Sequence, residues 1–414
     1  MSFKRLFSRS LNAAPDRLHF AAHSHHLWPD ASFDGHTQCW LDAAALADRK
    51  WDKVMGEVWL QAQAHVAAEL GVPADRIVFA SNTHDFLIRL FAAAPRRAGG
   101  PLRVLTSDSE FHSARRQLAR LEEEGLGQVT RVAAEPFASF SARFLEVARA
   151  GGHDLVLVSQ VLFGSGRIFD QTEALAALAD PAGPWMVIDG YHAFMALPLP
   201  LAGGEEARSA EGEGLSVATA TSPPPAAPAH RRGEGIFYLG GGYKYAMAGE
   251  GMAFLHCPPG FGPRPLVTGW FAEFGDLTAP PGSSVGYTAD AMRFMGATFD
   301  PSALYRFNAI QRMLSDEGLT TAAISAFVAG LQEQLLAALD GTAIGGAELL
   351  NPLDGGPHAR FLAFRTPKAA EWNAALMAGN CITDVRGDVL RLGLGLYHDE
   401  ADVAAFAELA RGLS

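Results

Sequence analysis

The chain has 414 residues, 49% of them apolar, and a formal net charge of −12. This length suffices for one large domain plus a smaller one, and the apolar fraction suffices for a sizeable buried core. Because the charge is acidic and no basic run follows a helix face, we expect no nucleic acid partner.

The chain contains three cysteines, Cys39, Cys257 and Cys381, which lie far apart and show no metal-ligand spacing. They fit free thiols in a reducing compartment. The first twenty residues lack the apolar run of a signal peptide, and no run in the chain reaches membrane-spanning length. We therefore expect a soluble, cytoplasmic protein with no membrane partner.

A helical pattern runs from about residue 42 to residue 70, and after it strands and helices alternate. The segments predicted as strands are 76–80, 102–108, 154–163 and 184–190, and those predicted as helices are 83–94, 113–125 and 172–180. This alternation predicts an α/β fold with a mainly parallel sheet covered by helices on both faces. Sites in such sheets lie at the carboxyl ends of the strands.

Residues 202–235 are rich in Ala, Gly, Pro, Ser and Glu and have almost no large apolar residue, which predicts a mobile surface insertion. After Pro301 come helices, short strands and a last helix, which is typical of a small α+β unit. We expect an N-terminal segment (1–41) that joins the small domain and the site, a large domain (42–295) and a small C-terminal domain (296–414).

One lysine, Lys244, stands among glycines and tyrosines in "YLGGGYKYAMAGEG", residues 238–251. Partial desolvation at a strand end lowers the pKa of a lysine and makes its amine nucleophilic. The alternative is that Lys244 extends to solvent and that the glycines only form a turn.

The segment "VIDGYHA" places Asp189 at the end of a buried strand and His192 three residues later. A buried carboxylate needs a cationic partner. A lysine that forms a Schiff base, together with an aspartate on the ring nitrogen, is what pyridoxal phosphate requires. Taken singly, Asp189 could equally be a helix cap or a turn residue.

A phosphate needs hydrogen-bond donors, and "ASNTHDF" offers Asn82, Thr83 and the backbone N–H groups of a helix that begins there. An ordinary helix cap is the alternative. "SEFHSARR" has the same form and adds Phe111, whose ring could stack on a flat cofactor.

In this order the motifs resemble the class V aminotransferase group of fold-type I pyridoxal phosphate enzymes, and within it most closely kynureninase. The motifs that carry the resemblance are Asp189 with His192, Tyr243 with Lys244, Gly269 with Trp270, and Ser159 in the strand "VLVSQVLFGSG". The resemblance implies that Ser159, His192, Tyr243 and Trp270 contact the cofactor. It also implies that Arg391, in "VRGDVLRLGLGLYHDEADV", binds the substrate carboxylate. Alternatively, Arg391 could pair with Asp384 or Asp388 on the surface.

The chain departs from the kynureninase pattern in places. Ala114 stands where the family has an aspartate, and the aryl-pocket helix after the N-terminus is shortened. Thr298, in "GAT", is similar to the threonine that class V aminotransferases donate to the phosphate across a dimer. We therefore expect a homodimer with Thr298 near the partner's cofactor.

The segment "HFAAHSHHLWPD" holds His23, His25 and His26 within four positions. No carboxylate or cysteine joins them at ligand spacing, so we expect no metal. The resemblance favours a loop that contacts the substrate, through His25 and His26, and a plain polar loop is the alternative.

These residues predict an enzyme that removes the Cα proton of an α-amino acid, with Lys244 as base and Asp189 on the ring nitrogen. A kynureninase-like hydrolase that cleaves Cβ–Cγ leads, and a class V aminotransferase or a β-eliminating, desulfurase-like lyase is the alternative. A non-catalytic binding protein with this fold is a second alternative. No G-x-S-x-G follows a predicted strand, and "GGGY" is not a G-x-G-x-x-G that opens a helix, so the motifs of an α/β hydrolase and of a dinucleotide fold are missing.

Overall fold

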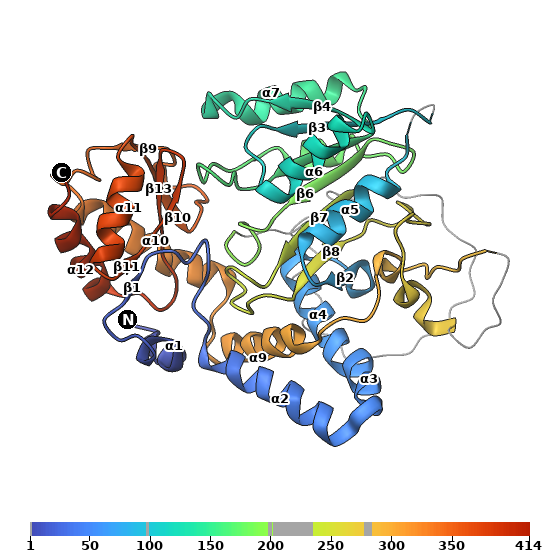
Figure 1. The fold of residues 1–414 in the computed structure, drawn as a ribbon, viewed down its shortest axis with the longest axis horizontal. Coiled ribbons are helices and arrows are strands. Elements are labelled where there is room, and N and C mark those ends of the chain that lie inside the picture. The colour runs from blue at the N-terminus through green and yellow to red at the C-terminus, as the bar shows by residue number, and fades with distance from the viewer. Residues whose placement is uncertain (1, 97–98, 198–200, 202–234, 277–283) are drawn as a thin grey trace.

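A computed structural model describes residues 2–96, 99–197, 201, 235–276 and 284–414. Its centre is a seven-stranded sheet with strand order β2-β8-β7-β6-β5-β3-β4 (Figure 1). The predicted insertion, 202–235, falls outside the described residues except for Gly235.

Most strands of the large sheet follow from apolar runs that are buried on both faces, whereas the edge strand β4 is polar and largely exposed. They are β2 (Ile77–Ala80), β3 (Leu102–Ser107), β4 (Gly127–Val132), β5 (Leu155–Ser159), β6 (Trp185–Asp189), β7 (Ile236–Gly241) and β8 (Ala253–His256). Strand β8 runs antiparallel to both of its neighbours, and the other pairings are parallel. The prediction of a mainly parallel α/β sheet is confirmed.

Helices cover this sheet, as the alternating pattern predicts (Figure 1). They include α4 (Trp59–Leu70), α5 (Thr83–Ala93), α6 (His112–Glu123), α7 (Phe137–Ala150) and α8 (Thr172–Ala176). In the register of β5 and β6, Ser159 lies beside Asp189. Two polar side chains at strand ends are therefore neighbours at the carboxyl edge of the sheet.

The N-terminal segment consists of α1 (Ser8–Asn12), β1 (Leu18–His19) and α2 (Asp30–Leu46), which α3 (Lys50–Lys53) follows. The helix expected from about residue 42 thus begins twelve residues earlier, at Asp30, and the expected boundary at 41/42 falls inside α2. Helix α2 packs along α9 (Ser302–Asp316). A Cβ on Gly35 would lie 2.6 Å from the carbonyl oxygen of Tyr305, so glycine permits this close approach. Phe33, Trp40 and Leu41 of this helix are exposed. Its apolar residues therefore do not gather on one buried face, and the helical periodicity in the sequence is weak.

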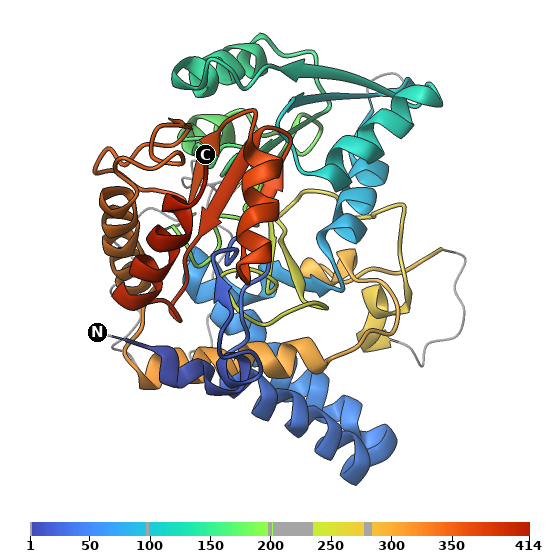
Figure 2. The same cartoon turned by 60° about the vertical axis from the view of Figure 1, so that its left-hand side comes forward.

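The C-terminal unit contains a four-stranded antiparallel sheet of order β12-β13-β10-β9. Its elements are α10 (Thr321–Ala338), β9 (Glu348–Leu349), β10 (Phe361–Arg365), α11 (Ala369–Ala378), β11 (Cys381–Ile382), β12 (Asp384–Arg386), β13 (Val389–Gly393) and α12 (Glu400–Arg411). Figure 2 brings these orange and red elements forward, with helices packed around the sheet.

Strand β1 joins the N-terminal segment to this unit, because it pairs in parallel with β11. A further bridge links Ala21 to Gly393 at the end of β13. The N-terminal segment is thereby held against the C-terminal sheet. No described helix is both long enough and apolar enough to cross a membrane.

Candidate active site

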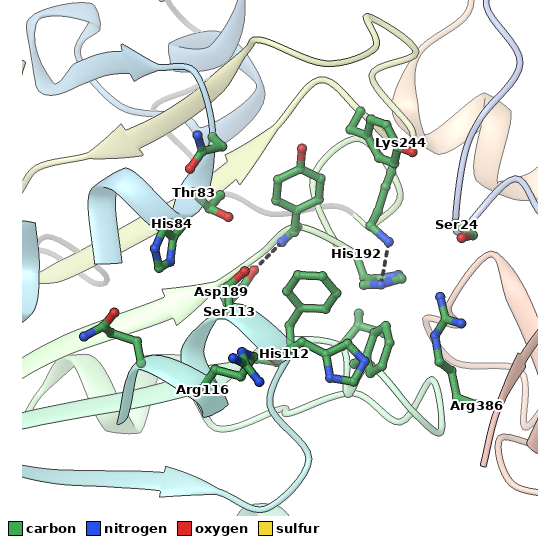
Figure 3. Close-up of a pocket in the computed structure, with 18 of the residues that line it drawn as sticks. Ser24, Thr83, His84, His112, Ser113, Arg116, Asp189, His192, Lys244 and Arg386 are labelled. Carbon is green, nitrogen blue, oxygen red and sulfur yellow. Dashed lines mark hydrogen bonds between the residues drawn. The ribbon is translucent and has the colours of Figure 1, made fainter. Parts of the chain in front are cut away.

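A cavity of about 1050 Å³ lies at the carboxyl ends of the strands of the large sheet. The residues predicted from the sequence that line it are Asn82, Thr83, Phe111, Ser159, Asp189, His192, Tyr243, Lys244 and Arg391. Figure 3 shows Thr83 and His84 at one end of the cavity and Arg386 at the other, with Asp189, His192 and Lys244 between them. The topology thus collects residues that lie more than three hundred positions apart in the chain.

Lys244 follows β7, and its side chain is only 9% exposed. Its Nζ donates to the backbone oxygen of His23 at 2.6 Å and lies 2.8 Å from Nε2 of His192. Burial lowers the pKa of Lys244 to about 7, and the nearby charge of Arg391 acts in the same direction. The amine is therefore available in its neutral, nucleophilic form near neutral pH.

The glycines before Lys244 have a steric role. A Cβ on Gly241 would lie 2.7 Å from the carbonyl oxygen of Met252 and 2.8 Å from Oη of Tyr191. Only glycine lets β7 pass this close to both groups. The ring of Tyr191 in turn lies 5.9 Å from Nζ of Lys244, so an aromatic wall faces the amine.

His192 is buried, and its Nδ1 has no hydrogen-bond partner within the described ranges. Burial, followed by the charge of Lys244, holds the pKa of His192 well below its usual value. The ring is therefore neutral and acts on Lys244 by hydrogen bonding only.

Asp189 ends β6, with its side chain directed into the cavity (Figure 3). Its Oδ1 accepts a hydrogen bond from the backbone N–H of Tyr191 at 3.0 Å. Burial raises the pKa of Asp189 to about 6. A half-buried carboxylate with one backbone donor favours a cation beside it.

The N-terminus of α5 opens onto the same cavity. Oδ1 of Asn82 accepts the backbone N–H of Asp85 at 3.0 Å, so Asn82 is the helix cap. Thr83 begins the helix, and its hydroxyl lines the cavity beside the first-turn N–H groups. A helix N-terminus with a hydroxyl next to it can hold an anion.

Two phenylalanines line the cavity. Phe111 is 40% exposed, and its ring meets that of Phe163 edge to face at a centroid distance of 5.2 Å. The guanidinium of Arg391 lies over the Phe163 ring at 4.5 Å. This wall is apolar, flat and close to a cation, so it suits a planar group.

Arg391 lies on β13, is 1% exposed and lines the cavity. Its Nε donates to Oδ2 of Asp384 at 2.7 Å, and its Nη1 donates to the backbone oxygen of Phe163 at 2.6 Å. The sequence left open whether Arg391 lines a pocket or pairs with Asp384. It does both, and the pair is buried rather than on the surface.

Several residues of the site were missed at the sequence level. Glu110 is buried, and its carboxyl group accepts hydrogen bonds from the hydroxyl groups of Ser107 and Ser159, at 2.5 Å each. Burial raises the pKa of Glu110 to about 7. Glu110 directly precedes Phe111 just after a predicted strand, and this position was the sequence signal that could have identified it. Glu110 does not line the cavity itself but bonds to Ser159, which does, whereas Arg386 lines the cavity directly and only the fold brings it there.

Other predicted residues lie outside the residues that line this cavity. Trp270 is 44% exposed, and Thr298 is also exposed, both at the surface of the chain. His26 is buried, and its Nδ1 lies 2.7 Å from the backbone oxygen of Leu27. His25 does not line the cavity itself, but its ring packs edge to face against that of Tyr243, which does, at a centroid distance of 5.2 Å.

The side chains of the three neighbouring histidines lie in different environments: the ring of His23 stacks on Phe361, while that of His25 packs against Tyr243. Across the described part of the chain, no group of three or more His, Cys, Asp or Glu side chains could hold a metal ion. None of the three cysteines lines the cavity: Cys257 and Cys381 are buried elsewhere and Cys39 lies on α2.

The large mainly parallel sheet, the C-terminal α+β unit and the lysine at the strand ends define the fold as that of the fold-type I pyridoxal phosphate-dependent enzymes. The chain is similar to the apo structure of a cysteine desulfurase from Thermococcus onnurineus NA1, with 16% identity, full coverage of both chains and a TM-score of 0.76.

Two further solved structures share the fold. The cystine C–S lyase C-DES, in complex with its reaction product cysteine persulfide, is 15% identical over 97% of this chain and 99% of the other, with a TM-score of 0.74. The cysteine desulfurase CsdA from Escherichia coli is 13% identical over 95% of this chain and 94% of the other, with a TM-score of 0.72. No protein-family profile and no curated protein sequence matches the chain. The resemblance to kynureninase therefore rests on the motifs alone.

Proposed function

We propose that this chain is a pyridoxal 5'-phosphate-dependent enzyme that cleaves a bond to Cβ of an α-amino acid, with β-elimination of a C–S bond as the leading reaction. The observation that carries the proposal is the placement of Lys244 and Asp189 in one cavity, a buried amine with a pKa near 7 beside a half-buried carboxylate.

The residues of the cavity fit the cofactor group by group. Among the described residues no cation forms an ion pair with Asp189, whose Oδ1 accepts only the backbone N–H of Tyr191, and a protonated ring nitrogen would supply that cation. His192 has an orphaned buried Nδ1, which a ring substituent can satisfy. The N-terminus of α5, with Thr83, suits a phosphate. The ring of Phe111 suits a planar heterocycle.

When bound, pyridoxal phosphate withdraws electrons from Cα of an amino acid joined to it. The chain supplies the rest. Lys244 would hold the cofactor, and its amine, whose pKa burial lowers, would accept the Cα proton. Asp189 keeps the ring nitrogen protonated, because its carboxylate stabilises the positive charge there. Arg391 binds the substrate carboxylate.

We infer C–S elimination from the solved structures that share the fold and from two features of the site, which has a base at Lys244 and no cysteine in its lining. Elimination needs a single base at Cα, and Lys244 provides it. Transfer of sulfur to the enzyme would need a thiol at the cavity, and none of the three cysteines lines it. A lyase that releases its sulfur-containing product is therefore favoured over a desulfurase that keeps it.

Hydrolytic Cβ–Cγ cleavage of a kynurenine-type substrate is the second candidate. The wall of Phe111 and Phe163 suits an aryl group, and it lies on the same side as Arg391. The motifs that resemble kynureninase support this candidate as well.

A homodimer is part of the proposal. Trp270 and Thr298 are exposed and lie outside the cavity of their own chain. In a dimer of the kind that the resemblance implies, Thr298 would face the cofactor phosphate of the partner, which needs several donors.

Product analysis tests the proposal. Purified protein should show a visible absorption band, and incubation with L-cystine should yield pyruvate and ammonia. Alanine from kynurenine would favour hydrolysis, and conversion of an added keto acid to its amino acid would favour transamination. A protein that takes up no cofactor would overturn the proposal entirely.

A further inference from the structure

One carboxylate holds two arginines of the cavity wall. Asp384 opens β12 and lies directly across from Arg391 on β13. Oδ2 of Asp384 accepts from Nε of Arg391 at 2.7 Å and from Nη2 of the same guanidinium. Oδ1 lies 2.9 Å from Nη2 of Arg386, which also lines the cavity.

The hydrogen bonds of Arg391 leave a defined pair of donors. A guanidinium has five N–H groups. Asp384 accepts from two of them, and the backbone oxygen of Phe163 accepts from one on Nη1. Among the described residues, one N–H therefore remains on each terminal nitrogen. A carboxylate accepts two such parallel donors.

The charge at this end of the cavity also suits one carboxylate. The two arginines are positive, and Asp384 carries one negative charge. His23, whose Nε2 lies 3.6 Å from Asp384, is neutral, because burial lowers the pKa of His23 to about 3. One net positive charge remains, which a single carboxylate balances.

We propose that Asp384 is a positioning residue: it fixes Arg391 with its free donors toward the cavity, and it holds Arg386 as a second arm for the same carboxylate. The inference deepens the proposed function, because that carboxylate is the α-carboxylate of the amino acid substrate. Arg386 has a side chain 41% exposed and meets the substrate as it enters. Both guanidinium groups lie over the Phe163 ring, at 4.5 and 5.7 Å, which keeps the arms together.

The test is a binding comparison with a matched control. Asp384→Asn removes the charge and one acceptor, whereas Asp388→Asn makes the same change on an exposed side chain of the same hairpin. The probes are L-alanine, which has the carboxylate, and L-alaninamide, which lacks it. Binding is followed by the shift of the cofactor absorption band, and KM and kcat are measured with L-cystine.

We expect Asp384→Asn to weaken L-alanine binding about tenfold, as when a charge-assisted hydrogen bond loses its alignment. Binding of L-alaninamide and the position of the absorption band should not change. KM should rise while kcat is retained, and Asp388→Asn should behave as the parent protein. Unchanged or tighter L-alanine binding would overturn the inference, because it would mean that Asp384 is inert or competes with the substrate for Arg391.

Two further measurements separate this inference from the proposed function. Arg386→Gln changes an exposed side chain, so folding is preserved, and we expect L-alanine to bind about threefold more weakly, as for a partly exposed charge. Unchanged L-alanine binding in Arg386→Gln would show that Arg386 does not contact the substrate carboxylate. Calorimetric titration of the cofactor-free protein with sodium acetate compares Asp384→Asn with Asp388→Asn without any cofactor. If the protein binds no cofactor, only the proposed function is overturned. If Asp384→Asn and Asp388→Asn bind acetate with equal affinity, only the role of Asp384 is overturned.

Discussion

Nζ of Lys244 lies 2.8 Å from Nε2 of His192, so a neutral ring, rather than a carboxylate, holds the lysine amine in the cavity. A carboxylate partner would stabilise the charged amine and raise its pKa. The neutral partner leaves burial and the charge of Arg391 to lower the pKa of Lys244 to about 7. The amine can therefore react near neutral pH.

Sodium borohydride should fix the cofactor to Lys244. Borohydride reduces the carbon–nitrogen bond by which a lysine amine would hold the cofactor aldehyde, and the buried amine of Lys244 lies in the cavity where that aldehyde would bind. Peptide mass spectrometry after reduction should show the label on the peptide that contains Lys244, and Lys244→Ala should abolish it. A label on another lysine, such as exposed Lys368, would remove Lys244 from its proposed role.

Asp189→Asn should retain cofactor binding but slow the exchange of the Cα proton of L-alanine by several orders of magnitude. The neutral amide cannot keep the ring nitrogen protonated, and a neutral pyridine withdraws electrons weakly. Exchange into deuterated water, followed by proton NMR, measures the rate. Asp170→Asn, at an exposed position, is the control and should exchange as the parent does. Near-normal exchange in the Asp189 variant would contradict the assignment.

Lys244→Met should stabilise the cofactor-free protein, and the gain should shrink as pH rises. The pKa of Lys244 is about 7 in the folded protein, against about 10.4 in an unfolded chain. Below pH 7 the folded state must keep a charged amine buried, which costs stability. Above about pH 10 the amine is neutral in both states and the cost disappears.

Thermal unfolding of the cofactor-free proteins checks this pH dependence. The gain in Tm from Lys244→Met should be largest at pH 6.5 and small at pH 10. Lys368→Met, which changes an exposed lysine, should give no such trend. A gain that stays constant across pH would mean that packing, rather than the buried charge, is responsible.

Glu110→Ala should destabilise the protein by about 3 kcal/mol. It removes the acceptor of three buried donors, which are the hydroxyl groups of Ser107 and Ser159 and the backbone N–H of Ser159. Urea unfolding measures the loss. Glu110→Gln keeps an acceptor oxygen and should lose much less. Equal losses in the two variants would show that the cavity left by the side chain matters and the hydrogen bonds do not.

Mixing two inactive variants should restore activity if the site is shared between subunits. Lys244→Ala lacks the base, and Thr298→Ala lacks the donor proposed to reach the partner's phosphate. In a mixed dimer one site contains both Lys244 and Thr298, so about a quarter of the parent activity should return after unfolding and refolding together. Thr298→Ala that is fully active alone, or no recovery on mixing, would count against the shared site.

The sequence by itself determined the alternation of strands and helices, and with it the parallel sheet and the edge where the site lies. It also identified Asp189 and Lys244, because each stands at the end of a buried apolar strand, where polar residues have few structural reasons to occur. These are local signals that apolar periodicity and residue type carry without any knowledge of distant contacts.

Only the tertiary structure decided which distant groups complete the site. The backbone oxygen of His23 meets Lys244 because β1 pairs with β11 and holds the N-terminal segment against the C-terminal sheet. Asp384 meets Arg391 because β12 and β13 are antiparallel in one register. Such contacts depend on packing between segments far apart in the chain, and the free energy that selects them comes from the buried surface of the whole fold, which no local pattern records.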